Sequence, residues 1–160
     1  MEQKEFLSRM TRVEDQLKIQ SLASQYCWIV DAGLDEKDES YINKLLGLFS
    51  DDAEVDYSQF GKYKGHEKIY YFFKDFVYTN FDSFRHYVQN FYIDIRGTTA
   101  ISKYYLNFYG IREGQSIMAS GKYYADCEKK GEEWKFKTLK AEFYIFNNVE
   151  AAWGQKKLFF

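Results

Sequence analysis

The first half of the chain carries apolar residues at helical spacing. The pattern Thr11-Arg12-Val13-Glu14 is a capping box, which predicts a helix start, and the apolar periodicity that follows continues to Asp31. The apolar positions of this predicted helix are Val13, Leu17, Leu22, Ile29 and Val30. Residues 40–49 predict a second, shorter amphipathic helix, and residues 66–79 predict a third helix that is rich in Tyr and Phe.

The second half of the chain changes to the two-residue period of strands. Alternation first occurs at 53–58, where Ala53, Val55 and Tyr57 are separated by polar residues. The GKYKG segment after it is typical of a turn with a short strand. Four longer strands are predicted at 84–95, 100–109, 116–128 and 133–146. The loops between them have the short lengths of an antiparallel meander.

This order of elements, helices first and long strands later, predicts an α+β fold. We expect three helices of the N-terminal half to pack over the concave face of one curved antiparallel or mixed sheet, which gives a cone. The mouth of such a cone is a favoured place for a ligand pocket. A chain of 160 residues fits a single domain over 1–160, with its core at about 9–146 and a C-terminal tail at 147–160.

Composition narrows the classes of function. The formal net charge of −2 gives no basic surface for phosphates, so we expect no nucleic-acid partner. No apolar run approaches the roughly 20 residues of a membrane span, and the first ten residues are too polar for a signal peptide, so a cytoplasmic protein is expected. Aromatic residues make up 21% of the chain and can supply both a thick core and pocket walls.

The sequence contains no metal or cofactor motif. Its two histidines and two cysteines show no metal-ligand spacing, and glycine patterns for phosphates or dinucleotides are missing. We therefore expect neither a metal nor a cofactor. Cys27 and Cys127 are interpreted as buried free thiols in a reducing compartment.

One of the two histidines lies within the predicted strand 84–95. Strand alternation places Phe84, His86, Val88, Asn90 and Tyr92 on one face. If that face is the inner one, His86 borders a pocket, or else it is a core histidine satisfied by a backbone carbonyl. Asn90 could line the pocket floor or hydrogen-bond a strand backbone.

The remaining polar candidates carry weaker signals. His66 is interpreted as an exposed residue in the first turn of the third helix. Lys140 and Glu142 on the last strand could form a pocket pair or an interface pair.

Three segments together resemble a known family. QYCWIVDAG, LFSDDAEVDYSQFGKYKGHEKI and RHYVQNFYIDIRGTTA are similar to the SnoaL-like branch of the nuclear-transport-factor-two-like superfamily. That group includes ketosteroid isomerase, scytalone dehydratase and the bile-acid dehydratases. The resemblance covers about 9–146 and implies a cystatin-like roll, a cone that hosts many functions.

The resemblance implies roles for four residues. His86 matches the strand histidine of the dehydratases, and Asp31 matches the helix aspartate that pairs with it. Tyr26 matches the helix tyrosine of ketosteroid isomerase and the bile-acid dehydratases. Tyr57 matches scytalone dehydratase, at the position where ketosteroid isomerase has its aspartate base.

The substrate-specific part of the family pattern differs in this chain. Phe108 and Tyr144 stand near the positions of an acidic residue and an arginine of the bile-acid dehydratases, and Val30 replaces a tyrosine of scytalone dehydratase. The second histidine of scytalone dehydratase has no clear counterpart, nor does its Ser/Asn pair. The predicted substrate pocket comprises Asn90, Val88, Phe108 and Tyr144.

The resemblance and the residue types predict a cofactor-independent lyase or isomerase. His86 would take a proton from a carbon next to a carbonyl, Asp31 would orient it, and Tyr26 and Tyr57 would donate hydrogen bonds. The expected substrate is a hydrophobic, oxygenated ring compound, polyketide- or steroid-like, and dehydration is preferred over isomerisation. The alternative is a non-catalytic cone that binds a small ligand or serves in assembly. The family also implies a homodimer or homotrimer formed through the outer sheet face.

Overall fold

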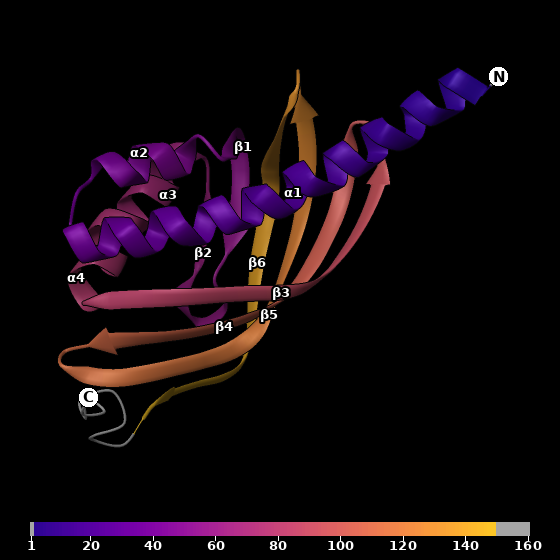
Figure 1. The fold of residues 1–160 in the computed structure, drawn as a ribbon. Helices are drawn as coiled ribbons and strands as arrows, with labels where there is room; N and C mark the ends of the chain where they lie inside the picture. Colours follow the sequence, from indigo (N-terminus) through magenta and orange to yellow (C-terminus); the bar gives the residue numbers. More distant parts are fainter. Residues whose placement is uncertain (1, 150–160) are drawn as a thin grey trace.

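The computed structural model describes residues 2–149 and contains an α+β arrangement. Its elements, in chain order, are α1 (Glu2–Glu36), α2 (Ser40–Leu46), β1 (Phe49–Asp56), a 3₁₀ turn η1 (Ser58–Phe60), β2 (Lys62–Lys64), α3 (His66–Tyr71), a π-helical segment η2 (Phe72–Val77), α4 (Tyr78–Asn80), β3 (Ser83–Arg96), β4 (Thr99–Arg112), β5 (Gln115–Lys130) and β6 (Glu133–Asn148). Figure 1 shows α1 lying across the sheet, with α2, α3 and α4 grouped near its C-terminal end.

The six strands form one mixed sheet in the order β2-β1-β6-β5-β4-β3. β1 pairs with β6 in parallel, and every other neighbouring pair is antiparallel. The long strands bend as they pass under α1 (Figure 1). This confirms the predicted α+β class with helices over a curved sheet. Most of the predicted tail, 150–160, lies outside the described residues, and 147 and 148 belong to the end of β6.

The predicted start of the first helix is wrong. α1 begins at Glu2, and Thr11 lies in its interior rather than at its N-cap. Val13 and Leu17 are 52% and 60% exposed, so they do not belong to the core. The buried face consists of Asp15, Ile19, Leu22, Ala23, Tyr26, Cys27, Val30, Gly33 and Leu34. The sequence therefore carries two apolar stripes on opposite faces of α1, and within residues 2–149 only one of them is buried.

The helix predicted at 66–79 is divided by a change of helical type. α3 passes into the six-residue π-helical segment η2 before α4. A π-helical turn is wider than an α-helical turn and is often found at functional sites. In this chain it brings Phe72, Phe73 and Val77 into the buried interior. The second helix is also shorter than predicted, because Phe49 already belongs to β1.

Two irregularities in the strands place residues outside the pocket that were predicted to line it. The β3–β4 register shifts between Gln89 and Tyr92, and Asn90 has a positive φ of 57°. A bulge of this kind reverses the alternation of the side chains that follow it. Asn90 is therefore exposed, Tyr92 is 61% exposed, and Phe91 is the residue that packs against the core.

The second irregularity lies where β5 meets β6. Gly121 pairs with Phe143, but Ser120 pairs with Ile145, so Tyr144 is the additional residue on β6. Tyr144 is 55% exposed and lies outside the pocket, contrary to the prediction. The strands approach closely at this point, since a Cβ on Gly121 would lie 2.1 Å from the carbonyl oxygen of Glu142. Glycine is thus required there.

The interior between helices and sheet is rich in aromatic side chains. Both cysteines, Cys27 and Cys127, are free and buried within it. Burial raises the pKa of Cys127 to about 12, which keeps this thiol protonated. Among residues 2–149, no helix combines the length and the apolar character needed to cross a membrane.

Candidate active site

The central feature of the site is a two-point contact between His86 and Asp31. The Nδ1 atom of His86 lies 2.5 Å from Asp31 Oδ1, and the backbone N–H of His86 donates to Asp31 Oδ2 at 2.9 Å. Their side chains are only 6% and 13% exposed. Because the carboxylate can only accept, Nδ1 carries the proton. In a neutral imidazole the other nitrogen, Nε2, is then an unprotonated acceptor.

This contact depends on two elements distant in sequence. Asp31 lies in the last turns of α1, and His86 lies near the start of β3, which packs beside this helix. A carboxylate near a helix C-terminus is disfavoured by the helix dipole unless a partner compensates it. Here two N–H donors of one residue provide that compensation.

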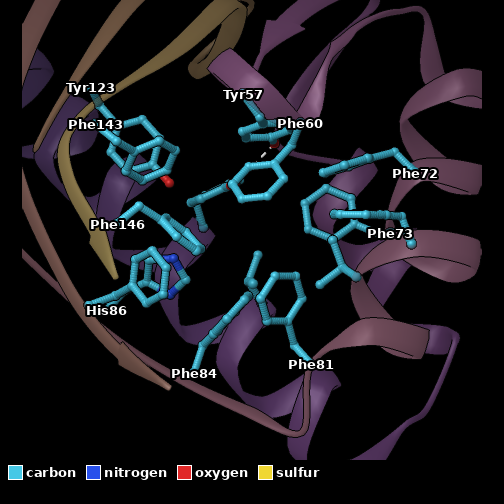
Figure 2. A pocket seen from close by; sticks show the side chains of 15 residues that line it. Tyr57, Phe60, Phe72, Phe73, Phe81, Phe84, His86, Tyr123, Phe143 and Phe146 are labelled. Atoms are coloured by element: carbon cyan, nitrogen blue, oxygen red, sulfur yellow. Dashed lines mark hydrogen bonds between the residues drawn. The ribbon is translucent and has the colours of Figure 1, made fainter. Parts of the chain in front are cut away.

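The imidazole is otherwise surrounded by aromatic rings. Its ring centroid lies 5.5 Å from that of Phe84, 5.4 Å from Phe108 and 6.4 Å from Tyr26. Within the described residues, the imidazole is hydrogen-bonded to Asp31 alone. Figure 2 shows the ring on the wall of the hollow, beside Phe84 and Phe146. Nε2 is therefore available for a group that enters this hollow.

Three tyrosines supply further polar groups to the same hollow. The hydroxyls of Tyr26 and Tyr57 lie 3.0 Å apart, and Tyr123 packs edge-on against Tyr26 with ring centroids 5.9 Å apart. Burial raises the pKa of all three well above its ordinary value. For Tyr26, the hydrogen bond with Tyr57 lowers the pKa and that with Tyr123 raises it, but burial dominates. All three remain protonated donors at neutral pH.

Tyr123 is a site residue that the sequence alone does not single out. It lies on β5, where the buried residues alternate from Ile117 to Cys127. The only available signal is its place on the inward face of that strand. With fifteen tyrosines in the chain, this signal does not distinguish a pocket residue from a core residue.

The remaining wall of the hollow is apolar. Fifteen residues line it: His86, the three tyrosines, nine phenylalanines and two valines. The cavity volume is about 50 Å³. Since a water molecule needs roughly 10–15 Å³ measured in this way, the hollow accommodates a few waters in this conformation. A ring compound requires some of the phenylalanine side chains to move.

Of the four predicted pocket residues, one lines the hollow and three do not. Phe108 lines the hollow, whereas Val88 is half-buried against the core and is not among the lining residues. Asn90 and Tyr144, displaced by the two strand irregularities, lie outside it.

The other polar candidates lie away from the hollow. Lys140 and Glu142 form an ion pair of 3.7 Å with side chains 51% and 44% exposed, so they are not a pocket pair. His66 is half-buried rather than exposed, and its Nε2 lies 3.2 Å from the carbonyl oxygen of Phe49. Over residues 2–149, no three His, Cys, Asp or Glu side chains lie close enough together to hold a metal ion.

Comparisons with known proteins agree with this architecture. The solved structure of a hexachlorocyclohexane dehydrochlorinase, LinA type 2, has a TM-score of 0.79 and 22% sequence identity, over 90% of this chain and 95% of that chain. A Novosphingobium aromaticivorans protein provisionally named scytalone dehydratase has a TM-score of 0.77 and 18% identity, over 90% and 93%. An NTF2-like protein with a cystatin-like fold from the same species has a TM-score of 0.73 and 16% identity, over 88% and 89%. These likenesses define the fold as the NTF2-like, cystatin-like cone.

The family follows from a direct sequence match. A family model of the SnoaL-like domain matches residues 11–140, which is most of the chain. The protein therefore belongs to the SnoaL-like domain family. A search among curated proteins found no match.

Proposed function

We propose that this protein is a cofactor-independent lyase, a dehydratase that eliminates water from a hydrophobic, oxygenated ring substrate. The observation that carries this proposal is the orientation of His86. Asp31 binds its Nδ1 side at 2.5 Å, and its other nitrogen is left for a substrate within an apolar, tyrosine-containing hollow. A base, a group that orients it and donors for developing charge are the parts that such an elimination requires.

The proposed reaction begins with proton abstraction. The lone pair of His86 Nε2 takes a proton from the carbon next to a ring carbonyl, and the electrons of that C–H bond form an enolate. Collapse of the enolate expels a hydroxyl from the adjacent carbon, so that a carbon–carbon double bond forms and the C–O bond breaks. The proton held by the imidazolium protonates the leaving hydroxyl, which departs as water. His86 returns to its neutral form without a cofactor.

The tyrosines would act on the developing negative charge. A hydroxyl aimed at the carbonyl oxygen strengthens its hydrogen bond as the oxygen becomes negative, and loss of one such donor costs about 2.7–4 kcal/mol in a dry site. Tyr57 and Tyr26 form one hydrogen-bonded pair, with Tyr123 packed behind Tyr26. Their raised pKa values suit donors that stay protonated throughout.

The names of two structural neighbours favour an elimination. Structural relatives include a dehydrochlorinase and a protein provisionally named scytalone dehydratase, and both names denote eliminations. The hollow of this chain is almost wholly apolar apart from the four polar side chains. A largely hydrophobic ring therefore matches it better than a sugar or a phosphate ester.

A second candidate function is a non-catalytic cone that binds a small apolar ligand. The observation that favours it is the cavity volume of only about 50 Å³, because the surrounding phenylalanines fill most of the interior. A binder of this kind would tolerate loss of the imidazole, since apolar contacts would carry the affinity.

The proposed reaction can be tested with 3-hydroxy-1-tetralone, whose dehydration yields 1-naphthol with a distinct ultraviolet absorbance. The wild type is expected to accelerate this conversion, and His86→Ala is expected to lower kcat by about 10²–10⁴. His66→Ala is the matched control, because it removes the other histidine of the chain, outside the hollow. If the wild type binds tetralones but forms no product, the binding function replaces the enzymatic one.

The oligomeric interface expected from the family is part of the same proposal. The outer sheet face presents Tyr87, Tyr92, Tyr105, Tyr109 and Tyr144, each at least 41% exposed. We expect this surface to pair copies of the chain in a dimer or trimer. Sedimentation of Tyr105→Glu against the wild type would test it.

A further inference from the structure

The back of α1 carries an apolar stripe that nothing in the described chain covers. Phe6, Met10, Val13, Leu17 and Trp28 are 62%, 51%, 52%, 60% and 74% exposed. At about 100° per residue, all five fall on one face of the helix, opposite the face that packs on the sheet. In Figure 1, the N-terminal part of α1 projects beyond the other helices.

The first turns of α1 contribute no buried residue to the described part of the chain. Asp15 is the first buried residue of the helix, so about three turns before it make no core contact. An isolated helix of that length is marginal in water. Apolar residues of this exposure along one face are typical of a helix that packs against a partner.

The stripe is complementary to itself. Between Leu17 and Trp28 it contains only small residues, Ser21 and Ser24, both of which are exposed. If two α1 helices run antiparallel about a two-fold axis at Leu17, the residue numbers of any two facing residues add up to 34, which is twice 17. Phe6 then faces Trp28 of the second copy, with Met10 opposite Ser24 and Val13 opposite Ser21. Large side chains thus meet small ones at the two intermediate layers, as tight helix packing requires.

The parallel arrangement is less complementary. With the helices in register, each residue meets its own copy, so Ser21 and Ser24 would leave a gap beside the two Trp28 rings.

The geometry points to an interface between two copies of this chain, formed by antiparallel packing of their α1 helices about Leu17. This interface is distinct from the outer sheet face and does not depend on the proposed reaction. It includes the projecting turns of α1, which explains why they are helical without any core contact of their own.

Cysteine cross-linking tests both the contact and its direction. With helix axes about 8–10 Å apart and each Cα about 2.3 Å from its axis, facing Cα atoms lie close enough for a disulfide. Leu17→Cys is expected to form a disulfide dimer under mild oxidation. Met10→Cys alone is expected to form none, whereas a mixture of Met10→Cys and Ser24→Cys is expected to give the mixed dimer. The wild type is the background control, because both native cysteines are buried.

The association itself is measured by light scattering on the full chain. Leu17→Glu is expected to reduce the molar mass of the complex at least twofold, while Thr11→Glu, an exposed change on another face of α1, leaves it unchanged. Circular dichroism verifies that both variants fold. Failure of Leu17→Cys to cross-link, a self-dimer of Met10→Cys, or a molar mass unaffected by Leu17→Glu would each overturn the inference. The last result would instead favour assembly through the sheet face alone.

Discussion

Replacing Asp31 by asparagine changes one oxygen of the carboxylate to an NH₂ group and leaves the size of the side chain unchanged. In the native protein one oxygen accepts from the backbone N–H of His86 at 2.9 Å, and the other accepts from Nδ1 at 2.5 Å. The backbone N–H can only donate, so the single amide oxygen of the substituted side chain must face it. The NH₂ group is then directed at Nδ1.

This exchange should move the proton of His86 to the wrong nitrogen. An NH₂ group beside Nδ1 requires Nδ1 to accept, which places the ring proton on Nε2 and removes the lone pair that the proposed reaction uses. Loss of the orienting carboxylate in Ser–His–Asp triads lowers kcat by about 10⁴ for this reason. We expect a loss of about 10²–10⁴ in kcat with 3-hydroxy-1-tetralone, which corresponds to about 3–5 kcal/mol of transition-state stabilisation.

The assay combines kinetics with nitrogen-15 NMR of the imidazole. NMR should report a proton on Nδ1 in the wild type and on Nε2 in Asp31→Asn. Asp35→Asn is the matched control, because it makes the same change one helical turn further on, where Asp35 pairs with Arg85 at 2.8 Å. If Asp31→Asn shows the altered tautomer and still retains wild-type kcat, an unprotonated Nε2 is not needed for catalysis.

Three further predictions concern the tyrosines, the pH dependence of stability and the sheet. Tyr57→Phe should lower kcat by about 10²–10³ through loss of one hydrogen-bond donor. The control is Tyr104→Phe, which removes a buried hydroxyl that has no partner among the described residues. This variant should keep the wild-type kcat and unfold at an equal or higher urea concentration. Burial raises the pKa of Asp15, but hydrogen bonds from Lys129 and Trp134 outweigh it and leave the pKa lowered. Its stabilising contribution is therefore complete above about pH 4 and is lost as the pH falls through the lowered pKa. The urea midpoints of the wild type and Asp15→Asn should converge as the pH is lowered from about 6 to about 2.5. A constant difference between the two midpoints would contradict this assignment. Gly121→Ala should destabilise the protein by about 1–3 kcal/mol, because its Cβ would lie 2.1 Å from a carbonyl oxygen, and an unchanged urea midpoint would show that the sheet relaxes there.

The pairing of His86 with Asp31 is the part of the site that the sequence could indicate. Both residues stand in segments that resemble a family, and the strand period correctly places His86 on the inner face of β3. The same two-residue period gives the wrong face for Asn90, four residues later. A bulge at Asn90 adds a residue without interrupting the apolar pattern, so alternation alone cannot locate it. Tyr144 is misplaced for the same physical reason.

Other features depend on tertiary packing that no local pattern contains. The capping box at Thr11 is a real sequence signal, but α1 already begins at Glu2, so Thr11 lies in the interior of the helix. Tyr123 enters the site only because β5 lies opposite α1 in the folded chain. The cavity volume results from how nine phenylalanine side chains fill one interior. Sequence spacing therefore predicts the presence of an aromatic hollow but not the space inside it.

In the proposed reaction, the free nitrogen of His86 removes a proton from a carbon atom inside the hollow. This step can be measured by incubating 2-tetralone with the protein in D₂O and monitoring the incorporation of deuterium by proton NMR. The ketone 2-tetralone can lose a proton next to its carbonyl but has no hydroxyl to eliminate. We expect the wild type to accelerate the exchange and His86→Ala to lower the rate by about 10²–10⁴. Equal exchange rates for the wild type and His86→Ala, with both proteins folded and binding the ketone, would contradict this prediction.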